Sequence, residues 1–232
     1  MRVLVTGFEP FGGEPTNPSW EAASRLPKVL GGHEIIARRL PVEYDRAARE
    51  LAEAIAELRP DAVISIGQAG GRGAITPETV AINMAHTPSP DGAGEVCDGL
   101  KLLPFGEDGY FTNLDLRRGI EAIAAAGIPA RQSYDAGGYV CNAVMYTALC
   151  IQRAGDGRCY GLSDERTAIG AETQRVIESA ASEGFGGMKC GFIHIPFETE
   201  QATRRGKGEP SLPLEMMIRG ISAYIPAALG DA

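Results

Sequence analysis

Histidine and cysteine are scarce in this chain, and the few that occur form no metal-binding or disulfide pattern. There are three histidines, and the five cysteines include no CxxC pair. Structural zinc sites need closely spaced ligands and disulfide frameworks need paired cysteines, so neither is indicated. We therefore expect no metal, no cofactor and a reduced, cytoplasmic protein. The cysteines are Cys97, Cys141, Cys150, Cys159 and Cys190.

Long apolar runs and an excess of positive charge are also lacking. No stretch is long and apolar enough to span a membrane, which takes about 20 such residues. Residues 1–7 lack a small-residue cleavage site and are too short for a signal-peptide core, so we expect them to form a strand. The net charge is −8, from 22 basic and 30 acidic residues. Binding to phosphate backbones needs clustered Lys and Arg, so a nucleic-acid partner is not expected.

Two glycine-containing loops lack the signatures of nucleotide-binding sites. Residues 8–13 hold two aromatics beside glycines but not the spacing G-x-G-x-x-G. Residues 68–73 are dense in glycine, yet the Lys and Ser/Thr of a phosphate-binding loop are missing. Both follow expected strands, where an α/β sheet places its ligand crevice. The aromatics of the first loop fit a hydrophobic plug equally well.

The order of expected elements predicts an α/β protein. A chain of 232 residues with 44% hydrophobic content can bury one sizeable core, so we expect a single domain over residues 1–232. Strand-like and helix-like segments alternate, which indicates a three-layer α/β/α fold with a mostly parallel twisted central sheet. The expected strands are residues 2–7, 34–40, 62–67 and 190–195, and the expected helices are residues 18–24, 45–58 and 113–126.

Residues 134–149 contain the first candidate catalytic group. Gly137 and Gly138 form a turn, and from Cys141 the composition is helical, with no Gly or Pro until Gly155. Cys141 thus lies where a turn becomes a helix, and the partial positive charge there favours a thiolate. A cysteine at a helix start is also commonly a small buried apolar side chain, and this stretch alone leaves that alternative open.

His194 and Glu78 are the candidate partners of this cysteine. His194 stands in an apolar run that reads as a buried strand stopped by Pro196. It is either a hydrogen-bonded core histidine or, paired with Cys141, a general base. Glu78 precedes the apolar Val80 and can be a solvent-facing charge, or a carboxylate that the strand carries to the crevice.

Five motifs, in order, resemble those of the pyroglutamyl-peptidase I family, also called pyrrolidone-carboxylate peptidases, which are cysteine peptidases. The resemblance covers most of the chain, and residues 210–215 resemble the opening of the family's final helix. The motifs occupy residues 5–13, residues 17–19, residues 67–72 with Glu78 and residues 81–83, Gly137 with residues 139–142, and residues 191–196.

The resemblance implies an enzyme that hydrolyses the N-terminal pyroglutamyl residue of peptides through a thioester acyl-enzyme. It implies that Cys141 is the nucleophile, that His194 is its general base and that Glu78 orients the imidazole. The family also suggests pyroglutamyl peptides as substrates and a homotetramer as the assembly.

The resemblance further implies a substrate-binding set. An aromatic slot suits a lactam ring, which has apolar methylenes and one amide. Phe8, Phe11 and Tyr139 are expected to line the slot, and Gln68 to bond the polar edge of the ring. Asn17 is expected to shape the adjoining loop, and the set also includes Val140, next to the nucleophile.

The chain departs from the family pattern in three places. The segment between Cys141 and His194 is longer, which indicates an atypical insertion over residues 155–187. Within it we expect an amphipathic helix over residues 164–182, with Ile169, Val176 and Ile177 on one side, at an oligomer interface or beside the substrate entrance. Thr79 and Asp135 stand where the pattern has Arg and Thr.

Two alternative functions follow from these departures. One is a related thiol amidase that keeps Cys141 and His194 but accepts a different acyl group. The other is a catalytically silent binding protein in which the extra segment displaces His194 from Cys141.

Overall fold

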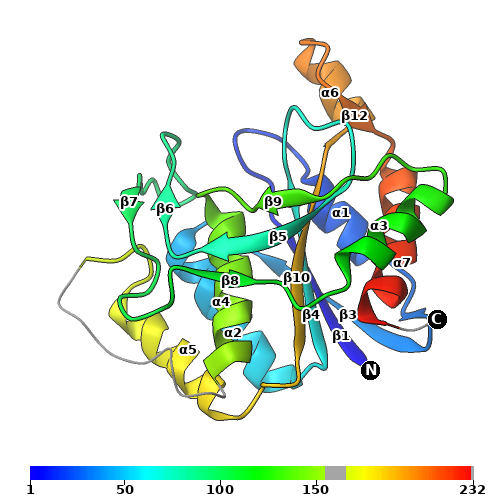
Figure 1. Ribbon diagram of the computed structural model, residues 1–232. Helices are drawn as coiled ribbons and strands as arrows, with labels where there is room; N and C mark the ends of the chain where they lie inside the picture. Colours follow the sequence, from blue (N-terminus) through cyan, green and yellow to red (C-terminus); the bar gives the residue numbers. More distant parts are fainter. Residues whose placement is uncertain (155–165, 231–232) are drawn as a thin grey trace.

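The core of the fold is a twisted sheet, shown in Figure 1. The computed structural model describes residues 1–154 and 166–230. Within these residues the largest sheet has eight strands. In sheet order they are β2 (Val29–Leu30), β3 (His33–Leu40), β1 (Arg2–Phe8), β4 (Ala62–Gln68), β10 (Lys189–Ile195), β5 (Thr76–Ile82) and β8 (Gly109–Phe111), with β9 (Ser133–Asp135) paired to β5.

Parallel pairing holds the middle of the sheet together. β1 runs parallel to both β3 and β4, β4 runs parallel to β10, and β9 runs parallel to β5. β5 is antiparallel to β10 and β8, and β2 is antiparallel to β3. The predicted α/β fold with a mostly parallel sheet is confirmed. The reversal at β5 was not predicted, because a strand's direction relative to its neighbour does not show in an apolar run.

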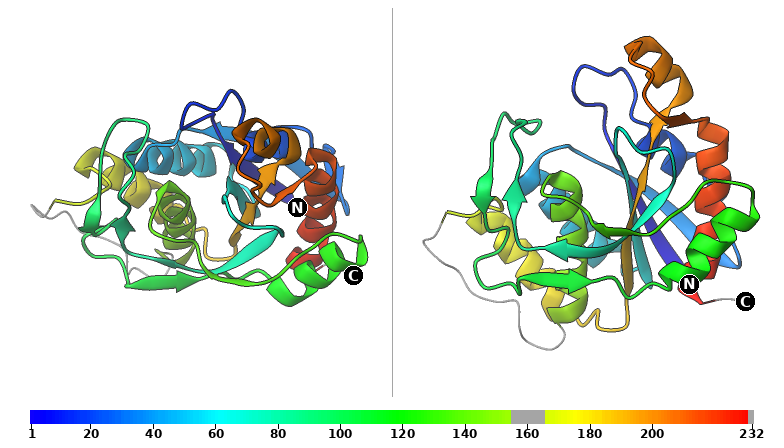
Figure 2. Two further views of the ribbon diagram at one scale, coloured as in Figure 1. Left: turned by 90° about the horizontal axis from the view of Figure 1, so that it is seen from above. Right: turned by 45° about the horizontal axis from the view of Figure 1, so that its top comes forward.

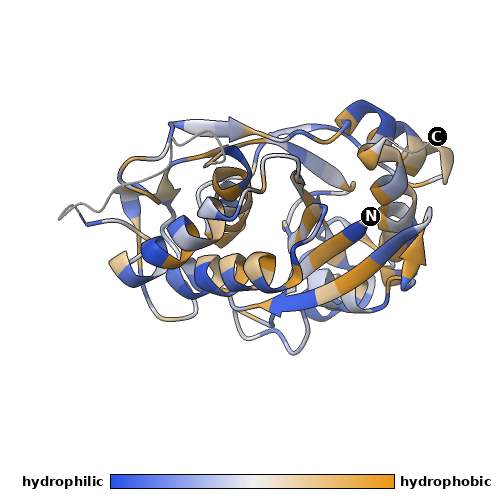
Figure 3. Ribbon diagram, turned by 90° about the horizontal axis from the view of Figure 1, so that it is seen from below, coloured by the Kyte–Doolittle hydropathy of each residue, from blue (hydrophilic) through white to orange (hydrophobic). Residues whose placement is uncertain are grey.

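Helices cover both faces of the sheet, as Figure 2 shows. One face carries α2 (Tyr44–Leu58), α4 (Val140–Arg153) and α5 (Ala171–Ser182), and the other carries α1 (Pro18–Ser24), α3 (Leu116–Ala125) and α7 (Leu214–Leu229). Successive residues of a strand belong to opposite cores: Val63 packs on the α4 side and Ile64 on the α7 side. Hydrophobic stretches accordingly run through the central strands in Figure 3. The three-layer arrangement follows from this alternation.

Two helices start at positions different from those expected. α3 begins after Asp115, whose carboxylate accepts the N–H of Arg118 at 3.0 Å, so the helix is shorter than residues 113–126. α5 begins after Gly170, whereas a helix was expected from residue 164. The short elements are β6 (Ala85–His86), β7 (Asp98–Leu100), β11 (Phe197–Glu198), α6 (Thr199–Arg205) and β12 (Ser211–Leu212).

The segment proposed as an insertion, residues 155–187, is only partly described. Residues 155–165 lie outside the described residues. From there on, Ile169 and Ile177 are buried in the core that α5 shares with α2 and α4, and Val176 is partly exposed. In Figure 1, α5 lies beside α2 and α4, towards the end of the molecule opposite the start of α4. That the segment is atypical of the family stays a prediction.

No helix within residues 1–154 and 166–230 has both the length and the apolarity needed to cross a membrane.

A close approach between β1 and α1 yields a stability prediction. A Cβ on Gly7 would lie 2.6 Å from the backbone oxygen of Ser19 and 2.7 Å from the Cα of Trp20. Because both are backbone atoms, Gly7→Ala must push α1 off the sheet, and we expect it to lower the free energy of unfolding by about 1–3 kcal/mol. Denaturant unfolding measures this.

The matched control is Gly186→Ala. A Cβ at Gly186 has no atom within 4 Å, and its φ is not positive. We expect this variant to unfold within about 1 kcal/mol of the natural chain. Equal destabilisation by both substitutions would contradict the packing argument.

Candidate active site

The register of β4 and β10 places His194 beside a glycine. In this parallel pair the Cα of His194 faces that of Gly67. Phe192, two residues earlier on β10, packs into the core on the α4 side, and the rings of Phe192 and His194 lie 4.8 Å apart. Since residues two apart on a strand share a face, the imidazole of His194 points to the α4 side of the sheet. The predicted buried strand and its stop at Pro196 are confirmed.

The start of α4 is anchored to the end of β5 by one buried amide. The Asn142 side chain accepts the N–H of Ile82 at 2.9 Å and donates to the carbonyl oxygens of Ile82 and Met84 at 2.8 and 2.9 Å. Gly137 has a φ of 80°, which turns the chain into the helix. Cys141 is thus the second residue of a helix whose first turn is fixed relative to the sheet, as the sequence predicts.

Cys141 projects from this turn onto β4. Its Sγ lies 2.8 Å from the point that a Cβ on residue 67 would occupy. Gly67 therefore leaves the space that the sulfur fills, because any side chain there would collide with it. Since Gly67 is the strand neighbour of His194, the thiol and the imidazole lie on the same face of two adjacent strands.

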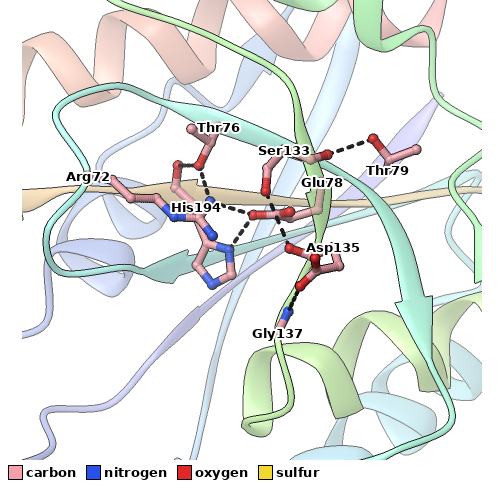
Figure 4. Close-up of polar contacts among 8 residues, drawn as sticks. All are labelled: Arg72, Thr76, Glu78, Thr79, Ser133, Asp135, Gly137 and His194. Carbon is pink, nitrogen blue, oxygen red and sulfur yellow. Dashed lines mark hydrogen bonds and ion pairs between the residues drawn. The ribbon is translucent and has the colours of Figure 1, made fainter.

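Glu78 holds the other nitrogen of the imidazole, as Figure 4 shows. Its Oε1 lies 2.6 Å from Nδ1 of His194, and the Glu78 side chain is fully buried. A carboxylate accepts hydrogen bonds only, so Nδ1 carries the proton and Nε2 keeps its lone pair. In Figure 4 the Nε2 edge of the ring is turned away from Glu78. The alternative that Glu78 is a solvent-facing charge is wrong.

Arg72 is the fourth member of this group. Its Nη1 donates to the same Oε1 of Glu78 at 2.7 Å and to the Oγ1 of Thr76 at 2.5 Å. Thr76 in turn donates to the carbonyl oxygen of His194 at 3.3 Å. Arg72 belongs to the motif at residues 67–72, but nothing in the sequence pointed to this contact.

The electrostatics of the site favour a neutral thiol and a neutral imidazole. Burial, and next the negative charge of Glu78, raise the pKa of the Cys141 thiol to about 12, although Arg72 opposes this. Burial lowers the pKa of His194 below its ordinary 6.5, although Glu78 opposes this. Burial therefore opposes the thiolate that the helix start favours.

A cavity of about 660 Å³ combines three of the predicted substrate-binding residues: Phe11, Gln68 and Tyr139. One wall comes from residues 87–92, which contribute Thr87, Ser89, Pro90, Asp91 and Gly92. Glu9, Pro10, Gly12 and Val42 complete the lining. Aromatic and proline surfaces with one side-chain amide could hold a small, flat and partly polar ring.

Three other predicted residues do not line this cavity. Phe8 is buried and packs against Phe192 with ring centroids 6.4 Å apart. Asn17 caps α1 by accepting the N–H of Ser19 at 3.0 Å, and it donates to the carbonyl of Glu9 at 2.9 Å. It therefore braces the loop that carries Phe11. Val140 is fully buried in the first turn of α4.

Two supporting residues were not predicted. Asp91 is buried and accepts the N–H groups of Tyr44, Ala93 and Glu95 at 2.9–3.0 Å, which fixes the wall formed by residues 87–92. Gln201 on α6 is also buried, and its Nε2 lies 3.3 Å from Oε1 of Gln68. The Asp91-Gly92 pair is typical of a turn and could have pointed to Asp91. Nothing in the sequence pointed to Gln201.

Among the described residues, no group of three or more His, Cys, Asp or Glu side chains could hold a metal ion.

The chain is similar to known proteins over nearly its whole length. The family model described as pyroglutamyl peptidase matches residues 1–158. Pyrrolidone-carboxylate peptidases from Lactobacillus acidophilus and Thermococcus onnurineus are 39% and 40% identical to this chain over 229 residues, which is 99% of this chain and of each relative.

Two solved structures are similar to this fold. Pyroglutamyl peptidase I from Bacillus amyloliquefaciens superposes with a TM-score of 0.81 at 35% identity, covering 98% of this chain and 96% of that one. A mutant pyrrolidone carboxyl peptidase from Pyrococcus furiosus gives 0.80 at 33% identity, covering 99% and 98%. The family match and these similarities show that this chain belongs to the pyroglutamyl peptidase family of cysteine peptidases.

Proposed function

We propose that this protein hydrolyses the N-terminal pyroglutamyl residue from peptides, with Cys141 as nucleophile, His194 as general base and Glu78 as the residue that orients the imidazole. The observation that carries the proposal is the placement of the Cys141 sulfur over Gly67, the strand neighbour of His194, while Glu78 binds the far nitrogen of the ring. Membership of the pyroglutamyl peptidase family supports the choice of acyl group.

Acylation starts from the neutral pair. Nε2 of His194 takes the thiol proton as Sγ of Cys141 forms a bond to a carbonyl carbon of the pyroglutamyl group, namely the one in the peptide bond outside the ring. The carbonyl oxygen becomes an oxyanion in this step. When the tetrahedral intermediate collapses, the C–N bond breaks and the imidazolium gives its proton to the leaving amine. The shortened peptide departs and a thioester on Cys141 remains.

Deacylation repeats the same proton transfers with water. His194 takes a proton from a water molecule, whose oxygen adds to the thioester carbonyl carbon. Collapse then breaks the C–S bond, the sulfur regains a proton from the imidazolium, and pyroglutamate leaves. Glu78 accepts the Nδ1–H throughout and stabilises the imidazolium that forms twice in each cycle.

Two further groups would serve these steps. The first backbone N–H groups of α4 have no acceptor inside the helix, and they can stabilise the oxyanion, at roughly 3 kcal/mol per donor. The cavity lined by Phe11, Gln68 and Tyr139 would hold the lactam ring, with the Gln68 amide on its polar edge. Phe8, Asn17 and Val140 would support that site from beneath and beside it.

The two alternatives account for less. A silent binding protein needs His194 to be displaced from Cys141, but the register places it next to the glycine under the sulfur. A thiol amidase of different acyl specificity would use the same three residues, and a panel of acyl groups separates it from the main proposal.

We also propose that the chain forms a homotetramer in the cytoplasm. The resemblance to the family supports the assembly. The four cysteines that the structure describes are all free thiols, which suits a reducing compartment. We expect light scattering to give a mass four times the 24.5 kDa of one chain. A monomer at micromolar concentration would contradict this part of the proposal.

Replacing the nucleophile tests the activity. We expect the natural chain to release the fluorescent amine from a pyroglutamyl amide and to leave a prolyl amide, which lacks the lactam carbonyl, uncleaved. Cys141→Ser should reduce kcat by at least about 1,000-fold, because an alkoxide is far harder to form from a hydroxyl than a thiolate from a thiol.

The control for that variant is Cys97→Ala, which removes a buried thiol that does not line the proposed ring site. It should keep most of the activity. Prolyl cleavage at a comparable rate would favour the alternative amidase, and a folded natural chain that cleaves neither amide would overturn the proposal.

The acid side of the pH profile reports on His194, which can act as a base only while neutral. Because burial lowers its pKa below 6.5, the imidazole should stay neutral as the pH falls past 6.5. We expect kcat/KM to hold through this point and to fall only when the pH passes the lowered pKa. Rates measured between about pH 4 and pH 8 give the midpoint, and a midpoint above 6.5 would be inconsistent with a buried neutral base.

A further inference from the structure

Arg72 and His194 share one oxygen of Glu78. The Nη1 of Arg72 lies 2.7 Å and the Nδ1 of His194 lies 2.6 Å from Oε1, as the dashed lines in Figure 4 show. Oε2 of Glu78 is buried and has no hydrogen-bond partner within the part of the chain that the structure describes. Both contacts to the carboxylate thus fall on the atom that orients the imidazole.

The burial of Glu78 makes a cationic partner necessary. Its side chain is fully buried, and an ionised carboxylate in such a place is strongly disfavoured unless a positive charge is paired with it. Arg72 supplies that charge from a side chain that is itself 25% exposed. A guanidinium keeps its charge at any pH at which a protein is folded, whereas His194 does not.

We propose that Arg72 is a positioning residue of the catalytic group. By neutralising Glu78, it allows the carboxylate to orient the imidazole without drawing a second proton onto the Glu78–His194 pair. The inference rests on the function proposed above, since a pair that already carries the extra proton has no free Nε2 to accept the thiol proton of Cys141.

The charged groups around His194 come from four elements. Glu78 lies on β5, Arg72 in the loop after β4, Asp135 on β9, and Cys141, the ionisable thiol, on α4. After burial, Glu78 raises the pKa of His194, Arg72 lowers it and Asp135 raises it. Arg72 also lowers the pKa of the Cys141 thiol. Arg72 is therefore the one cation in this group, and it favours the neutral base and eases ionisation of the thiol.

The test is the pH dependence of Arg72→Met, which keeps the aliphatic part of the side chain and removes the charge. We expect the acid midpoint of kcat/KM to move up by about one pH unit and kcat at pH 7 to fall roughly 10-fold. KM should change little, because Arg72 does not line the cavity. Arg72→Lys keeps the charge. Relative to Arg72→Met, it should bring the acid midpoint back to that of the natural chain more fully than it brings back kcat.

Two controls bracket the result. Arg117→Met removes an exposed arginine of α3 and should leave the profile unchanged. Asp135→Asn removes the exposed negative charge near His194 and should move the midpoint down, by less than Arg72→Met moves it up, because solvent screens its charge. Opposite shifts from Arg72 and Asp135 are not expected from general destabilisation.

A second measurement does not depend on activity. In the Cys141→Ala background, NMR titration of the His194 imidazole should show its pKa rising when Arg72 is replaced by Met. A folded Arg72→Met protein with unchanged midpoint and unchanged imidazole pKa would overturn the inference while leaving the proposed function intact. If Arg72→Met unfolds, the same comparison is made with Arg72→Gln, which also removes the charge, and Asp135→Asn, and the absence of opposite shifts again overturns it. Loss of the function itself would show as an inactive natural chain.

Discussion

The parallel register between β4 and β10 is the constraint on which the site depends. It sets His194 against Gly67, and the missing side chain at Gly67 admits the sulfur of Cys141. A shift of one residue would turn the imidazole to the α7 side and place a side chain under the thiol. This register belongs to continuous parallel pairing: β4 pairs with β10 along seven residues, and β1 pairs with β4 along four. The geometry of the proposed site is thus set by sheet pairing that joins segments from near the start of the chain to residue 195.

The same burial that positions the groups also opposes their ionisation. Within the site the imidazole and the carboxylate are buried and the thiol is partly exposed, and desolvation is the largest cause of the pKa changes at Cys141 and His194. Burial accordingly favours the neutral thiol and the neutral imidazole before any substrate binds. The buried Glu78 and the partly exposed Arg72 form a pair that is neutral overall. They can therefore orient His194 through a strong hydrogen bond without committing it to the charged form.

Much of the fold could be read from the sequence because its signals are local. The apolar runs at residues 2–7 and 62–67 became β1 and β4, and the Asn-Pro pair at Asn17 became the cap of α1. Cys141 and His194 stood out because each lies at a boundary between elements. The role of Arg72, the burial of Glu78 and the contact from Gln201 to Gln68 were not readable. Each depends on segments that are distant in the sequence and meet in the fold, and the spacing of residues along the chain does not predict such contacts.

The two single-residue departures expected from the resemblance, at Thr79 and Asp135, lie on one pair of strands. Thr79 on β5 donates to the carbonyl of Ser133 at 2.6 Å, which fastens β9 alongside β5. Two residues on, Asp135 accepts the N–H of Gly137 at 2.9 Å in the turn that enters α4 (Figure 4). Thr79 and Asp135 therefore hold the strand that leads to Cys141, and Asp135 also places a negative charge near His194. Thr79 in place of the Arg expected at this position is therefore compatible with the proposed reaction, because β9 still brings the first turn of α4 onto Gly67.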